Sequence, residues 1–164
     1  MTPTAVAENT STRSDLTLQV SRVIAAERSR VYQAWTRPEL MAQWFAPAPM
    51  YVTSMTADPR PGGEYRIDAF GPPCGPDADL SQAPSATQVA GVYREVVPDE
   101  LISFTWNGSR FPDEDTLVTV TFRDVPEGTE VTIKHEHFSS QEVADRHQHG
   151  WEGCLNNLEN FLKK

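Results

Sequence analysis

The chain has 164 residues, with 23 acidic side chains against 14 basic ones and a formal net charge of -9. This negative excess argues against binding to a nucleic-acid backbone or an anionic membrane, because both are held mainly by cations. No apolar run approaches the roughly 18 residues of a membrane span, and two cysteines make no disulfide framework. We therefore expect a cytoplasmic protein whose partners include no nucleic acid and no membrane.

The beginning of the chain divides into a tail and a first strand. Residues 1–15 are rich in Thr, Ser and Ala without periodicity, which predicts a disordered tail. The single domain is then expected over residues 16–164. Apolar and polar side chains alternate from Leu16 onward, which predicts a half-buried strand that ends near residue 25.

Two short helices are predicted next, over about 28–36 and 38–44, because apolar side chains recur there at helical spacing. Pro38 separates them, since the residue before a proline is pushed out of the helical region. Thr36 and Glu39 stand at the spacing of a capping box for the second helix.

From about residue 50 to residue 138 the pattern predicts strands joined by turns. In chain order, the predicted strands are 50–57, 64–70, 87–97, 101–106, 115–125 and 129–138. The segments 71–86 and 107–114 are predicted loops, the first because of its Gly and Pro content. Short connections between consecutive strands imply an antiparallel meander.

A long amphipathic helix is predicted after residue 139, capped by Ser139 with Glu142 or, alternatively, by Ser140. Its apolar stripe is Val143, His147, Trp151, Cys154, Leu155, Leu158, Phe161 and Leu162. The stripe must be buried against the apolar face of the sheet, and a helix about 10–12 Å across does not fill a curved sheet. The predicted fold class is therefore α+β, with about seven antiparallel strands wrapped around the C-terminal helix and space for a pocket between them.

Seven segments, in this order, resemble proteins like the activator of the heat-shock-protein-90 ATPase. They are Val31–Leu40, Gln43–Pro47, Gly62–Arg66, Gly91–Val96, Phe104–Trp106, Val131–Glu136 and Gly150–Trp151. This AHSA-type family belongs to the START or pollen-allergen-like (SRPBCC) superfamily, so the resemblance implies a helix-grip fold with a ligand-holding cavity. Two departures stand out: the segment 71–86 looks long and is expected to gate the cavity, and His137 stands where arginine is common.

The side chains expected to line this cavity are mostly aromatic or aliphatic, with three histidines. They are Trp44, Phe45, Tyr65, Tyr93, Phe104, Trp106, Val120, Phe122, Ile133, His135, His137, His147 and Trp151. For Trp44, Phe45, Trp106 and Trp151 ordinary core packing is the interpretation that we favour, and it is compatible with a place in a cavity wall. Either tyrosine hydroxyl has the chemistry to orient a ligand.

His135 and His137 are predicted to share one face of a strand, with side chains about 7 Å apart. Such a pair chelates zinc when a third ligand is available, here from His147 or His149. Cavity-lining or core histidines are the alternative that we favour, so we predict no metal and no cofactor. No catalytic residue is assigned, because neither Ser103 nor Ser109 has the surroundings of a nucleophile.

The function expected from these features is non-enzymatic binding of a hydrophobic small molecule, as a carrier, a sequestering protein or a sensor. Two alternatives stay open. One is an enzyme similar to polyketide aromatase/cyclases, with a histidine such as His135 or a tyrosine as acid or base. The other is a co-chaperone-type module in the stress response, which the family resemblance implies. A homodimer is also left open.

Overall fold

The computed structural model describes residues 16–46, 50–72, 84–109 and 111–163, with the backbone alone for 111–114. The predicted tail and most of the predicted loop 71–86 lie outside these residues. The elements are β1 (Leu16–Ile24), α2 (Arg28–Thr36), α3 (Pro38–Met41), β2 (Tyr51–Ala57), β3 (Glu64–Gly71), β4 (Ser85–Val97), β5 (Leu101–Gly108), β6 (Phe111–Val125), β7 (Gly128–Phe138) and α4 (Gln141–Leu162).

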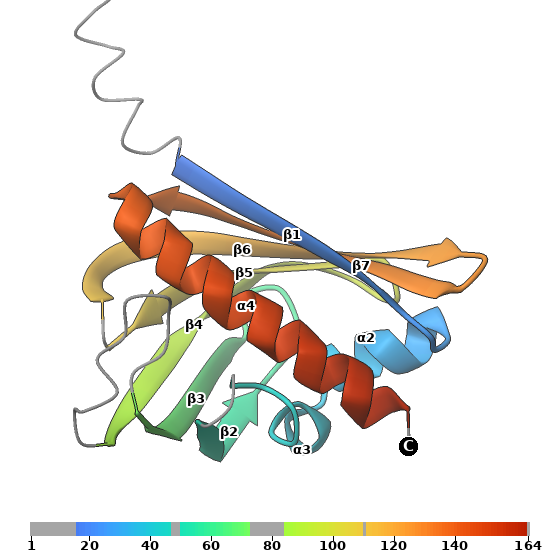
Figure 1. The fold of residues 1–164 in the computed structure, drawn as a ribbon, viewed down its shortest axis with the longest axis horizontal. Coiled ribbons are helices and arrows are strands. Elements are labelled where there is room, and N and C mark those ends of the chain that lie inside the picture. Colours follow the sequence, from blue (N-terminus) through green and yellow to red (C-terminus); the bar gives the residue numbers. More distant parts are fainter. Residues whose placement is uncertain (1–15, 47–49, 73–83, 110, 164) are drawn as a thin grey trace, which may run out of the picture.

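The seven strands form one antiparallel sheet in the order β1-β7-β6-β5-β4-β3-β2. Strands β2 to β6 each pair with the next strand in the chain, and β1 forms the far edge by pairing with β7. The long helix α4 lies across one face of this curved sheet, as Figure 1 shows. The predicted helix-grip fold is therefore confirmed.

Hydrophobic periodicity explains which side chains face the core between the sheet and the helices. On β6, Val118, Val120 and Phe122 are buried and alternate with less buried residues. The C-terminal half of α4 buries Trp151 and Leu155, together with Cys154, Leu158 and Leu162. Sheet and helix thus bury their apolar faces against each other, which is the driving force for this arrangement.

The N-termini of α4 and α3 differ in whether a side chain caps them. Ser140 is the N-cap of α4, and its side chain accepts a hydrogen bond from the Val143 backbone N–H at 3.3 Å, so the second of the two predicted caps is correct. The capping box predicted for α3 is wrong. The Thr36 hydroxyl instead donates to the Tyr32 carbonyl at 3.0 Å, one turn back on α2, and α3 begins at Pro38 without a side-chain cap.

The loop predicted over 107–114 is also wrong, because the β5–β6 hairpin continues through it. Gly108 pairs with Phe111, and the register is irregular between Trp106 and Gly108. The polar composition of this segment is typical of a loop, but the backbone pairing of the hairpin continues at Gly108 and Phe111.

A bulge near the end of β7 changes which histidines face the core. Leu16 pairs with Phe138 while Thr17 pairs with Glu136, so His137 is the extra residue, and its φ is 78°. His135 is therefore fully buried while His137 is exposed, and Phe138 turns inward. The prediction that the two histidines share a face is wrong, because strict alternation fails at a bulge.

Candidate functional site

An interior hollow lies between the two short helices and the β2–β5 half of the sheet. Its volume is about 10 Å³, which is room for a single water molecule. Its walls are Trp35 of α2, Met41 of α3, Met55 of β2, Tyr65 and Ile67 of β3, Tyr93 of β4, and Phe104 and Trp106 of β5. The hollow is therefore lined by rings, two thioethers and one aliphatic side chain, and none of the described residues that border it is charged.

Three rings form the sheet side of the hollow. The rings of Tyr65, Tyr93 and Phe104 lie with centroids 5.2 to 5.9 Å apart. Burial, followed by the neighbouring Tyr93, raises the pKa of the Tyr65 hydroxyl well above its usual value. The pKa of Tyr93 is raised too, again mainly by burial. Both hydroxyls are thus protonated and uncharged, which keeps this wall apolar.

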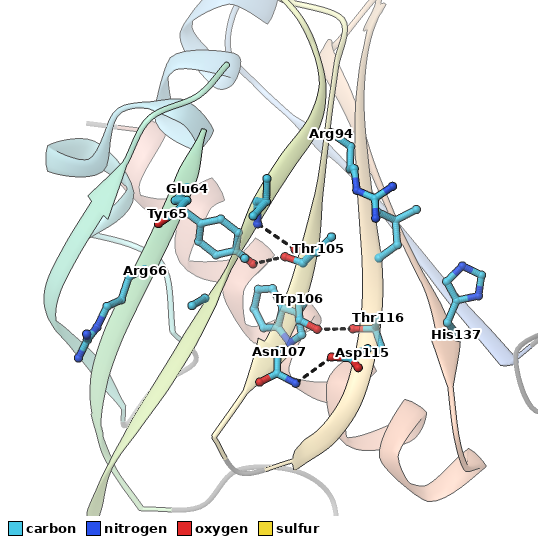
Figure 2. Close-up of a pocket in the computed structure, with 14 residues that line it drawn as sticks. Glu64, Tyr65, Arg66, Arg94, Thr105, Trp106, Asn107, Asp115, Thr116 and His137 are labelled. Atoms are coloured by element: carbon cyan, nitrogen blue, oxygen red, sulfur yellow. Dashed lines mark hydrogen bonds between the residues drawn. The ribbon is translucent and has the colours of Figure 1, made fainter. Parts of the chain in front are cut away.

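The Tyr65 hydroxyl reaches across the neighbouring strand. It donates to the Thr105 carbonyl oxygen at 2.6 Å, past Gly91, which is the residue paired with Tyr65 on β4. The Thr105 hydroxyl in turn accepts from the Val92 N–H at 2.8 Å. Figure 2 shows both bonds converging on Thr105. β3, β4 and β5 are therefore tied together at a point where any side chain on β4 would obstruct them.

The four tryptophans of the chain differ in how their indole N–H groups are used. Trp44 donates to the Ala34 carbonyl at 3.0 Å, and Trp151 donates to His135 Nδ1 at 3.0 Å. The N–H groups of Trp35 and Trp106 are buried and have no acceptor among the residues that the structure describes. These two unsatisfied indoles are the ones that border the hollow.

His135 belongs to a chain of directed hydrogen bonds. Because an indole N–H only donates, Nδ1 of His135 is the acceptor and Nε2 carries the proton. Nε2 then donates to the Thr116 hydroxyl at 2.7 Å, which donates to the Trp106 carbonyl at 2.9 Å. Burial, and secondly His147, lower the pKa of His135 well below its usual value. The imidazole is therefore neutral, with both nitrogens occupied.

His147 packs beside His135, at the edge of this hydrogen-bonded network. It is half-buried on α4, its ring centroid is 5.1 Å from that of His135, and its Nδ1 lies 2.9 Å from the Val143 carbonyl oxygen. Across the described part of the chain, no group of three His, Cys, Asp or Glu side chains is arranged to hold a metal ion.

A second depression, of about 730 Å³, lies on the face of the sheet away from α4. Its lining is Glu64, Tyr65, Arg66, Ala90, Gly91, Val92, Arg94, Thr105, Trp106, Asn107, Asp115, Thr116, Leu117 and His137. We call it the outer groove. Arg66 is paired with Asp68 at 3.1 Å, and Figure 2 shows Arg66 and Arg94 at opposite ends. Because charges of both signs surround it without converging, the outer groove selects no ligand by charge.

The predicted cavity residues divide into three groups. Tyr65, Tyr93, Phe104 and Trp106 border the hollow. Trp44, Phe45, Val120, Phe122, Ile133, His135 and Trp151 are buried elsewhere in the same core. His147 is half-buried beside that core, whereas His137 lines the outer groove instead of the interior. No lining side chain of the hollow comes from α4, although the predicted cavity lies between the sheet and that helix.

Four residues of the hollow were not among the predicted ones: Trp35, Met41, Met55 and Ile67. The helical spacing around Trp35 and Met41 predicted two short helices, and Ile67 alternates with polar residues on a predicted strand. Nothing in that local pattern indicated that α3 would pack against β2 and α2 against β6 and β7, because the position of each helix depends on contacts distant in sequence.

Comparisons with known proteins agree with this architecture. The model of the family described as Activator of Hsp90 ATPase homolog 1-like protein matches residues 25–163. No curated protein sequence matches the chain. Among the helices that the structure describes, none has the length and apolar character needed to cross a bilayer.

Several solved structures share the fold. The AHSA1 protein from Silicibacter pomeroyi is 19% identical with a TM-score of 0.72, over 90% of this chain and 98% of the other. The AHSA1-like protein from Aeromonas hydrophila is 23% identical with a TM-score of 0.69, over 90% and 92% of the two chains. A protein from Rhizobium leguminosarum is 27% identical with a TM-score of 0.69, over 90% and 94%.

Proposed function

The chain belongs to the family of Activator of Hsp90 ATPase homolog 1-like proteins, and we propose that it is a non-enzymatic binding domain for an apolar small molecule. The observation that carries this proposal is the lining of the interior hollow, which consists of aromatic rings, Met41, Met55 and Ile67 with no charged group. Small-molecule sites are typically lined in this way, with a few polar groups that orient the ligand.

The hollow must enlarge to accept a ligand, since about 10 Å³ holds only one water molecule. Met41 and Met55 are the side chains suited to move, because methionine is unbranched and adapts to irregular space. Met55 lies on the edge strand β2 and is half-buried, and Met41 belongs to the four-residue helix α3. Both therefore lie where a displacement disturbs little regular structure.

The expected affinity follows from the buried area. An aromatic ring that buries about 150–250 Å² gains about 4–6 kcal/mol at ~25 cal/mol per Å². Displacing the methionines offsets part of this gain. A single-ring ligand is therefore expected to bind with a dissociation constant of about 0.1–1 mM, and a larger natural ligand more tightly.

Methyl NMR of the methionines tests the proposal, with the apolar aromatic α-methylstyrene as probe. Met41 and Met55 border the hollow, whereas Met50 packs in a separate small cluster with Ala46 and Ala69. Selectively labelled methionine methyl groups thus include an internal control. We expect the Met41 and Met55 signals to shift saturably on titration while the Met50 signal stays in place.

Absence of saturable shifts at Met41 and Met55, up to the solubility limit of the probe, would contradict the proposal. Equal shifts at Met50 would also contradict it, because they would indicate non-specific association. Native mass spectrometry of protein purified from its own host complements the titration, since a natural ligand would appear as a defined mass increment.

The enzymatic alternative is less well supported. It requires a histidine or tyrosine that exchanges a proton with a substrate. His135 has both ring nitrogens in hydrogen bonds and a lowered pKa, and the Tyr65 hydroxyl already donates to Thr105. The co-chaperone alternative has the family description as its support.

A further inference from the structure

Two of the four indoles lack an acceptor within the described part of the chain, and this difference points to the chemistry of the ligand. The satisfied indoles, Trp44 and Trp151, do not line the hollow, whereas the unsatisfied ones, Trp35 and Trp106, do. We propose that the hollow binds a neutral aromatic molecule that carries a hydrogen-bond acceptor, such as a carbonyl oxygen, for the N–H of Trp106 or Trp35. This inference rests on the proposed function and specifies its ligand class.

Leaving these groups unsatisfied is costly. Trp35 is 1% exposed and Trp106 is 8% exposed, so water outside the protein does not solvate their N–H groups. A buried donor without an acceptor costs about 1–3 kcal/mol, and buried polar groups in folded proteins are nearly always paired. Two such donors beside one hollow therefore indicate a missing acceptor.

The indoles are held in place by their neighbours. The Trp35 ring lies 4.9 Å from that of Trp44 and 6.0 Å from that of Trp151, and the Trp106 ring lies 5.0 Å from that of Trp151. Packing against these neighbouring rings restricts the rotation of both indoles. The donors are thus preorganised, and an incoming acceptor gains the bond without the cost of ordering them.

The remaining lining side chains exclude other ligand classes. Among the residues that the structure describes, no Lys, Arg or His borders the hollow, so a carboxylate or phosphate would be buried there without a countercharge. No carboxylate of a described residue borders it either, and a cation has no lone pair to offer, so it would leave both indole N–H groups unsatisfied. A donor-only ligand would leave both indoles unsatisfied, because an indole N–H cannot accept. A neutral acceptor on an aromatic body fits both the donors and the rings.

Two probes of nearly the same shape test this inference. Acetophenone carries a carbonyl oxygen where α-methylstyrene carries a methylene group, so the ratio of their dissociation constants reports the acceptor. We expect W106F to weaken the binding of acetophenone relative to that of α-methylstyrene by about fivefold or more, since one hydrogen bond is worth about 1 kcal/mol. The matched control is W44F, which removes an indole that is already bonded and should leave the ratio unchanged.

A measurement on the wild-type chain keeps the test valid if W106F does not fold. In ¹H–¹⁵N spectra, the indole signals of Trp106 or Trp35 should move downfield with acetophenone and much less with α-methylstyrene. The inference would be overturned if both probes bind, the ratio of their dissociation constants is the same in wild type and W106F, and the indole signals do not move. That result would indicate that water alone satisfies the indole N–H groups. Failure of both probes to bind would overturn the proposed function as well.

Discussion

The indole of Trp151 donates to Nδ1 of His135 across 3.0 Å, and this bond joins α4 to β7 in the middle of the core. The bond fixes the tautomer of His135, so the proton lies on Nε2 and is donated through Thr116 to the Trp106 carbonyl. One buried histidine therefore links the helix to three adjacent strands. Its role is structural, and because the imidazole is neutral in the fold, the free energy of unfolding should depend on pH.

The first prediction concerns the pH dependence of stability. The pKa of His135 is lowered in the folded protein, mainly by burial and secondly by His147. Below its usual pKa of about 6.5, the unfolded chain binds a proton at this site and the folded protein does not. Stability is thus fully present above about pH 6.5 and falls as the pH drops, by up to about 1.4 kcal/mol per pH unit.

Urea unfolding between pH 5 and pH 7.5 measures this slope, and H135Q supplies the comparison. A glutamine can accept from Trp151 and donate to Thr116 without titrating. The free energy of unfolding of the wild-type chain should therefore fall more steeply with acid than that of H135Q, and H147Q separates the part due to His147. Parallel slopes for wild type and H135Q would show that His135 is protonated in the fold.

The second prediction concerns the hydroxyl of Thr116. T116V keeps the shape of the side chain but removes the acceptor for His135 Nε2 and the donor to the Trp106 carbonyl. We expect a loss of about 1–3 kcal/mol in the free energy of unfolding, because a buried N–H is left unsatisfied. T121V, on the opposite face of β6, is the matched control and should change stability by less than about 0.5 kcal/mol. Equal effects of both variants would argue that the hydrogen bonds of Thr116 contribute nothing.

The sequence predicted the fold wherever local periodicity determines structure. Alternation at Val118, Val120 and Phe122 identified the inward face of β6, and the stripe of α4 identified the helix that packs on it. These patterns are local, and burial of an apolar face leaves a single sheet and a single long helix few arrangements.

The candidate site could be predicted only in part. Tyr65 and Phe104 were expected in a cavity and both border the hollow, but its position depends on how α3 packs against β2 and α2 against β6 and β7, which no local pattern encodes. His137 was misplaced because a bulge adds one residue and reverses the alternation after it. The unsatisfied indole N–H groups could not be predicted either, because whether an N–H finds an acceptor depends on tertiary contacts.

The third prediction uses two glycines with opposite surroundings. A methyl group at Gly91 would fall on the Thr105 carbonyl, which is the acceptor of the Tyr65 hydroxyl. G91A should therefore lower the free energy of unfolding by about 1–3 kcal/mol. At Gly150, within α4, a methyl group would meet nothing within 4 Å. G150A should raise the free energy of unfolding by about 0.5–1 kcal/mol, because alanine favours the helix. Chemical denaturation of both variants gives the two signs, and a stable G91A would mean that β4 does not approach β5 closely.

The fourth prediction concerns the backbone of His137, whose φ of 78° is strained for any residue with a side chain. H137G removes the strain and should leave stability unchanged or raise it by up to about 1 kcal/mol, whereas H137V should lower it by more than about 1 kcal/mol, since a β-branched residue tolerates this conformation least. Both variants lose the same imidazole, so their difference in free energy of unfolding isolates the backbone. K134G, at an exposed position of the same strand, should instead be destabilised, because glycine in an ordinary strand costs entropy. If H137G were as destabilised as K134G, the bulge would not be the conformation of β7 in solution.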